Sequence, residues 1–272
     1  MPSAGFRLTL ELAGDENSNN ERLVEQLESD PRLRFGMLAG ANLVMFGGGR
    51  PVKTIRQAVA QLGRRKCLSL LWLVALSDFL RAWPDLHETA RLKLWRHSLL
   101  TGALAHQLLQ GANLSALGDA LAAGMAHDIG HLLLVGPGAR LGVVWHEEHD
   151  QLVETTVSPA PERDHCRLGA SLLTLWGAPA VLVASALHHH DPSAAEEEHR
   201  PLVVGVRLAD LLAEHVNLDR PARPLRLEVE PAWQQLAAFE PWKQVVDLHH
   251  LAIERLIDSL LTAEHLANLL GG

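Results

Sequence analysis

Leu, Ala and other helix-forming residues dominate the pattern of apolar and polar positions along the chain, and runs of β-branched residues are few. Pro, Gly and polar stretches divide this pattern into segments. We predict helices at about Asn20–Ser29, Pro31–Met45, Thr54–Gly63, Arg65–Trp83, Asp85–Gln110, Leu117–Leu134 (with a break near Gly130), Glu162–Trp176, Pro179–His190, Pro201–Val216 and Trp242–Leu269. The pattern therefore indicates an all-α, multihelical fold.

These segments suggest one helical domain with flanking parts. We expect an irregular segment 1–20, a smaller N-terminal helical half 21–84, a larger helical half 85–216, and a linker with C-terminal helices packed on the domain at 217–272. One short strand is expected at Phe6–Leu12, and loops at Glu148–Pro161 and Asp191–Arg200. A leucine stripe in the last helix offers an alternative role as a homodimer surface.

Composition narrows the function classes. The chain of 272 residues carries a formal net charge of −8, which disfavours a nucleic-acid binder because such proteins usually show a basic face. It has two cysteines, Cys67 and Cys166, too far apart in sequence for a disulfide framework or a cysteine zinc site to be expected. We read no signal peptide and no apolar run long enough to span a membrane, and so expect a soluble cytoplasmic protein.

Histidine is unusually frequent, with 16 residues, and one motif stands out: Met125-Ala126-His127-Asp128-Ile129-Gly130. Adjacent His127 and Asp128 supply one neutral nitrogen and one charged oxygen ligand. Mixed ligands of this kind suit a divalent transition metal such as Fe, Mn, Co, Ni or Zn. The dipeptide alone is a weak signal, since His149-Asp150 and His190-Asp191 also occur.

Three further candidate ligands lie on apolar helix faces: His97, His165 and Asp210. An acid on such a face is costly to bury unless it is paired or bound to a metal. Each has a structural alternative. The two histidines can be hydrogen-bonded core residues, Asp210 can pair with Arg207, and His127 with Asp128 can be a buried pair without metal.

The other histidines are expected at the surface or in loops: His106, His131, His146, His149, His199, His215, His249, His250 and His265. Cys166 adjoins His165 and so invites a Cys–His pair. Neighbouring helical side chains point about 100° apart, so we do not expect that pair to form.

Six segments in this order resemble a known family: LESDPRLRFGMLAGAN, TIRQAVAQLG, LWRHSLLTGALAHQL, GMAHDIGHLLL, DHCRLGASLLTLWGAP and SALHHHDP. Together they resemble the HD superfamily, and more closely its HDOD domains (HD-related output domains), over roughly residues 21–216. The larger half, 85–216, corresponds to the HD-like part.

The resemblance implies a ligand set. In catalytic HD proteins, residues matching His97, His127, Asp128 and Asp210 bind a first metal, and residues matching His165 and two adjacent histidines bind a second. Of the run His188–His190, the family pattern before Pro192 favours His189 and His190. Catalysis in such proteins uses a metal-activated water held at the pair matching His127 and Asp128, which attacks a phosphate ester.

The chain also departs from the catalytic pattern. His131 stands where related HD-GYP phosphodiesterases have Lys, and Lys93 stands where such enzymes often have a Glu ligand. The GYP segment is missing, and the acidic stretch DPSAAEEE replaces it. Such a loop would repel an anionic substrate if it lay near the site.

Three functions follow as hypotheses. The first is a regulatory output module that acts on a signalling protein partner, with a metal that is structural or vestigial, or with none. The second is a metal-dependent phosphohydrolase acting on a nucleotide or cyclic dinucleotide. The third is a small-ligand sensor, for instance of a nucleotide, without turnover. None of them requires a nucleic acid or a membrane.

Overall fold

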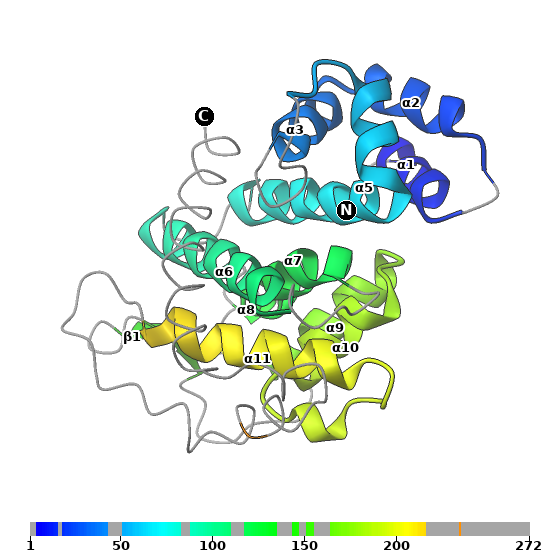
Figure 1. The fold of residues 1–272 in the computed structure, drawn as a ribbon. Helices are drawn as coiled ribbons and strands as arrows, with labels where there is room; N and C mark the ends of the chain where they lie inside the picture. Colours follow the sequence, from blue (N-terminus) through cyan, green and yellow to red (C-terminus); the bar gives the residue numbers. More distant parts are fainter. Residues whose placement is uncertain are drawn as a thin grey trace. The chain divides into compact units, whose positions relative to one another are not determined.

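In the computed structural model of the chain, the described residues are 4–15, 18–42, 51–82, 88–109, 117–134, 143–146, 151–154, 164–215 and 234. Helices dominate them, which confirms the predicted all-α class (Figure 1). The chain divides into two compact units, Met1–Asp78 with His265–Gly272 and Phe79–Glu264. The predicted C-terminal helices lie outside the described residues.

The first unit contains α1 (Ala4–Gly14), α2 (Asn20–Ser29), α3 (Pro31–Ala41) and most of α5 (Ile55–Ala82). The strand expected at Phe6–Leu12 is wrong, because α1 covers it. Alternation in FRLTLEL suits a strand, but the buried positions include Phe6, Thr9, Leu10 and Ala13, which is helical spacing. The ring of Phe6 meets Trp72 edge to face, with the ring centroids 6.3 Å apart.

Local signals set the helix boundaries of this unit as the sequence predicts. Asp30 caps α3 by accepting hydrogen bonds from the backbone N–H groups of Arg32 and Leu33, and Pro31 occupies the first turn. The hydroxyl of Thr54 accepts from the N–H of Gln57 at the start of α5. Gly63, with φ of 71°, kinks α5 where the sequence predicts one helix to end and another to begin. α3 ends at Ala41, earlier than the expected Met45.

The second unit carries the predicted ligands. Its elements are α6 (Glu88–Leu109), α7 (Leu117–Ala126), α8 (His131–Leu134), β1 (Val143–His146), β2 (Gln151–Glu154), α9 (His165–Leu175), α10 (Ala180–His188), the 3-10 helix η3 (Pro192–Ala194) and α11 (Arg200–His215). The α6 helix packs on α7 and α11, and α10 packs on α9 and α7 (Figure 1). The loop expected at Glu148–Pro161 is partly wrong, because β2 pairs there with β1 as an antiparallel hairpin.

Glycines allow the ligand-bearing helices to approach closely. A Cβ atom on Gly124 of α7 would lie 2.6 Å from the Cα of Gly102 on α6. A Cβ atom on Gly205 of α11 would lie 2.7 Å from a methyl carbon of Leu109 on α6. The α6 and α7 backbones are therefore in contact, and α11 packs closely on a side chain of α6, which brings residues of the three helices to one place.

Candidate metal centre

The seven predicted ligands converge inside the second unit. They come from five places: His97 on α6, His127 and Asp128 in the turn after α7, His165 at the first position of α9, His189 and His190 directly after α10, and Asp210 on α11. His127 and His189 have no exposed surface, and Asp210 is 3% exposed. The other four are half-buried or exposed. Three buried polar groups from three separate segments are unusual unless the groups satisfy one another or a bound ion.

One group of atoms, here called cluster A, consists of His97 Nε2, His127 Nε2, Asp128 Oδ2 and Asp210 Oδ1. His97 Nε2 lies 3.4 Å from His127 Nε2, 3.7 Å from Asp128 Oδ2 and 3.2 Å from Asp210 Oδ1. His127 Nε2 lies 3.3 Å from Asp128 Oδ2 and 3.4 Å from Asp210 Oδ1. Ligands held tetrahedrally about 2.1 Å from a metal are about 3.4 Å apart, so this spacing fits one metal ion.

A second group, cluster B, consists of the Nε2 atoms of His165, His189 and His190 with Asp128 Oδ1. His165 Nε2 lies 3.4 Å from His189 Nε2 and 3.1 Å from His190 Nε2. Asp128 Oδ1 lies 3.6 Å from His165 Nε2 and 3.4 Å from His189 Nε2. The spacing again fits a single ion. Among the described residues, His188 belongs to none of the sets of three or four potential ligand atoms that lie within 4.8 Å of one another.

Asp128 belongs to both clusters through different oxygens. Its Oδ2 faces His97 and His127, whereas its Oδ1 faces His165 and His189. A carboxylate arranged in this way can bridge two cations. It holds this position because Asp128 is the second residue of the turn between α7 and α8.

The hydrogen bonds of two histidines show which ring nitrogens remain for a metal. The Nδ1 of His127 lies 2.7 Å from the carbonyl oxygen of Gly124. The Nδ1 of His189 lies 3.2 Å from the carbonyl of Ser185 and 3.1 Å from that of Ala186. Because a carbonyl only accepts, each Nδ1 carries a proton and donates it. This contact with a backbone carbonyl is the usual support of a metal-bound histidine, and each Nε2 faces its cluster.

The electrostatics favour a cation between these groups. Burial opposes ionisation of Asp210, but hydrogen bonds from His127 and His97 outweigh it and hold the pKa of Asp210 well below its usual value. Burial likewise opposes ionisation of Asp128, while the charge of His127 and hydrogen bonds from His127 and His189 keep its pKa well below the usual value. The site therefore holds two ionised carboxylates, one buried (Asp210) and one partly buried (Asp128). Arg207 donates to Asp210 Oδ2 at 2.7 Å, so the expected ion pair exists while Oδ1 remains directed at cluster A.

Protonation supplies positive charge in the absence of a metal. Burial disfavours the imidazolium of His127, but the carboxylates of Asp128 and Asp210 outweigh it and raise the pKa of His127 well above its usual value. A divalent cation would replace that proton and neutralise the carboxylates more fully. The donor set thus fits a metal chemically as well as by its spacing.

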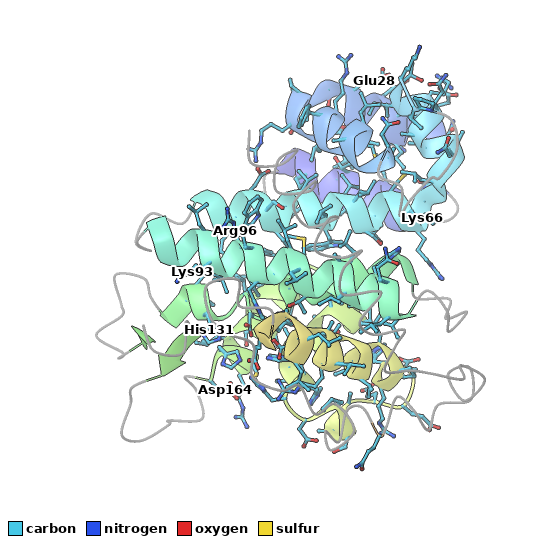
Figure 2. The ribbon with its side chains drawn as sticks, turned by 60° about the vertical axis from the view of Figure 1, so that its left-hand side comes forward. Glu28, Lys66, Lys93, Arg96, His131 and Asp164 are labelled. Carbon is cyan, nitrogen blue, oxygen red and sulfur yellow. The ribbon has the colours of Figure 1, made fainter. Side chains whose placement is uncertain are left out.

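Two histidines were wrongly expected at the surface. His131 is 7% exposed, and its ring stacks on that of His165 with the centroids 4.1 Å apart and the planes 12° apart. Figure 2 labels it together with Asp164, the residue that caps α9. Burial lowers the pKa of His131 to about 3, so its ring is neutral. His106 is also buried, at 5% exposed. The expectation that His106 lies at the surface is wrong because α7 and α11 both pack on α6 and cover two of its sides.

The expectation that Cys166 and His165 do not pair is also wrong, because the two side chains are in contact. Cys166 Sγ lies 3.4 Å from His165 Nε2. The Cβ directions do diverge, but the imidazole is long enough for its outer nitrogen to reach back to the neighbouring sulfur. The sequence signal for this contact is that His165 and Cys166 are adjacent, at the first two positions of α9.

Residues 2–192 match the model of the HDOD domain family. Since the match covers more than half of the chain, the protein belongs to this family. A curated relative, an uncharacterized protein of Treponema pallidum (strain Nichols), is 24% identical over 206 residues. That alignment covers 73% of this chain and 39% of the relative, so the chain spans well under half the length of that protein.

Solved structures share the fold. An HDOD domain protein of unknown function from Geobacter sulfurreducens superposes with a TM-score of 0.73 at 21% identity, covering 99% of this chain and 92% of that one. A Shewanella amazonensis SB2B protein named "Putative phosphohydrolase" gives a TM-score of 0.67 at 22% identity, with 98% and 94% covered. A Marinobacter aquaeolei VT8 protein named "Putative signal transduction protein" gives 0.58 at 19%, with 98% and 60% covered. Among the described residues, no helix is long and apolar enough to cross a membrane.

Proposed function

We propose that this protein is an HDOD-type signal-transduction output module whose second unit holds two divalent transition-metal ions, one in each cluster. The observation that carries the proposal is the orientation of Asp128, with one oxygen in cluster A and the other in cluster B. Nitrogen and carboxylate donors of this kind suit Fe, Mn, Co, Ni or Zn.

The positions of the residues that would hold the metals indicate how metal binding would act in an output module. Cluster A joins α6, the turn after α7, and α11, while cluster B joins that same turn to α9 and the end of α10. Metals at these positions would cross-link helices that are distant in sequence and fix one arrangement of them. A protein partner that recognises this arrangement would thereby respond to metal occupancy.

A metal-dependent phosphohydrolase is the second candidate, favoured by the completeness of both clusters. When bound, the metals would supply Lewis-acid chemistry to a phosphate ester. Against turnover, His131 is neutral and buried where related enzymes have a lysine. The acidic side chains Glu196, Glu197 and Glu198 are exposed on the segment between η3 and α11 of the same unit. They add negative charge to this unit and so disfavour an anionic substrate.

Elemental analysis of the purified protein after loading with Zn²⁺ or Mn²⁺ tests the metal centre. The wild type should bind two equivalents, and Asp128→Ala should bind fewer than one because it removes the shared carboxylate. Glu197→Ala is the matched control, because it removes an exposed carboxylate of the same unit and should retain two equivalents. A wild type that binds no metal would overturn the proposal.

Hydrolysis assays of the metal-loaded protein separate the output module from the enzyme. Nucleotides and cyclic dinucleotides serve as substrates, with His127→Ala as the inactive control. We expect no turnover above that control. Turnover in the wild type that His127→Ala abolishes would establish the phosphohydrolase, and saturable nucleotide binding without turnover would point to a ligand sensor.

A further inference from the structure

Cys166 supplies a sulfur atom at the edge of cluster B. Its Sγ and one ring nitrogen each of His165, His189 and His190 form a set of four ligand atoms that all lie within 4.8 Å of one another. The Sγ–Nε2 distance to His165 is 3.4 Å. In a tetrahedral site with bonds of about 2.3 Å to sulfur and about 2.1 Å to nitrogen, these two atoms would be about 3.6 Å apart.

Cys166 is held in a fixed position beside the proposed metal site. It is 5% exposed and lies in the first turn of α9. Its backbone N–H donates to Asp164 Oδ1 at 2.9 Å, which fixes the start of the helix. Three imidazoles stand around the sulfur, so this is a donor set and not an isolated buried cysteine.

We propose that Cys166 is a ligand of the metal in cluster B, which adds a thiolate to the three imidazoles and the Asp128 oxygen of this position. The proposal rests on the metal centre proposed above, and it adds which metal ions one of the two positions prefers. On binding, the thiol proton passes to solvent and the sulfur lone pair forms the bond to the metal. Cluster A has only nitrogen and oxygen donors, so the two positions differ in their preferred ion.

This difference predicts a metal preference. Thiolate ligands favour zinc and similar soft or borderline ions over manganese and magnesium, which prefer oxygen. Cluster B should therefore take Zn²⁺ or Co²⁺ from a mixture containing excess Mn²⁺, whereas cluster A discriminates less.

Absorption spectra of the full chain loaded with two equivalents of Co²⁺ test the assignment. A cobalt–thiolate bond gives a charge-transfer band in the near ultraviolet, which imidazole and carboxylate ligands do not. The samples are the wild type, Cys166→Ser and Cys67→Ser. The chain has two cysteines, so Cys67→Ser leaves Cys166 as its one sulfur ligand of this type and is the matched control.

We expect the band in the wild type and in Cys67→Ser, and its loss in Cys166→Ser. Cobalt content is measured on the same samples. Cobalt bound by the wild type without the band would overturn the role of Cys166 and leave the metal centre standing, as would a band that persists in Cys166→Ser. A wild type that binds no cobalt would overturn both proposals. Should Cys166→Ser fail to fold, the wild-type and Cys67→Ser spectra still decide.

Discussion

Gly130 and His165 are in direct backbone contact. A Cβ atom on Gly130 would come too close to the carbonyl oxygen of His165 for any side chain to fit, and would lie 2.7 Å from the backbone nitrogen of Gly169. This contact joins the turn that carries His127 and Asp128 to the start of α9. It therefore sets the distance between Asp128 Oδ1 and the His165 ring, which cluster B requires.

Replacing Gly130 by alanine should destabilise the second unit. Backbone atoms oppose the new methyl group on two sides, so α9 must shift, and overpacking of this kind costs about 1–3 kcal/mol. Urea denaturation followed by circular dichroism measures the change in the free energy of unfolding. The same variant should bind about one equivalent of metal less, because His165 moves away from Asp128.

Gly14→Ala is the control for this substitution. No atom lies within 4 Å of a Cβ at Gly14, so the change should be neutral or stabilise by up to about 1 kcal/mol. Equal stability of Gly130→Ala and the wild type would mean that the two backbones do not hold each other in solution.

Alanine substitutions of the neighbouring residues His188 and His189 should differ sharply in the amount of metal that the protein binds. His189→Ala removes a buried ligand of cluster B and should reduce the bound metal from two equivalents to about one. His188→Ala, at the last residue of α10, should keep both equivalents because His188 is outside the clusters. Elemental analysis measures the metal bound by both variants. A comparable loss of metal in the two would contradict the assignment of His189, but not His188, to cluster B.

Metal removal should lower thermal stability. Asp210 is buried and Asp128 is partly buried, the pKa of each carboxyl lies well below its usual value, and divalent cations would neutralise both carboxylates. Zn²⁺ at about a hundred times its dissociation constant should stabilise the folded state by about 2.7 kcal/mol. For a unit of this size the melting temperature should rise by about 5–10 °C. Asp128→Ala should abolish most of this shift in differential scanning fluorimetry, and a full shift in that variant would place the metal elsewhere.

The helices could largely be predicted because their local signals are strong. Asp30 with Pro31 fixes the start of α3, and Gly63 fixes the kink of α5. The segment Phe6–Leu12 was misjudged because its apolar positions satisfy both the helical and the strand period, and packing against Trp72 selects the helix. The β1–β2 hairpin was missed since its pairing is a tertiary contact within a polar stretch.

The seven ligands and their division into two groups could be proposed from the order of motifs and the family resemblance, but the position of Asp128 between the two groups could not. Which oxygen of Asp128 faces which cluster depends on how α6, α9 and α10 meet, and this depends on close contacts such as Gly102 with Gly124. His131 was assigned to the surface because sequence spacing does not show that α9 covers the turn at Gly130. Cys166 was dismissed on Cβ directions alone, which ignore the length of an imidazole.

The thiol of Cys67 should react very slowly with thiol reagents in the folded protein and readily after unfolding. Burial raises the pKa of its thiol to about 12, and the side chain has no exposed surface. At pH 8 about one thiol in ten thousand would be ionised, and the thiolate is the reactive form. In the Cys166→Ser background, dithiobis(nitrobenzoate) should therefore label less than a tenth of the native protein within an hour and all of it in denaturant. Because the ionised fraction rises as the pH approaches the raised pKa, labelling should accelerate between pH 8 and pH 10. Rapid stoichiometric labelling of the native protein at pH 8 would show that α5 exposes Cys67 in solution.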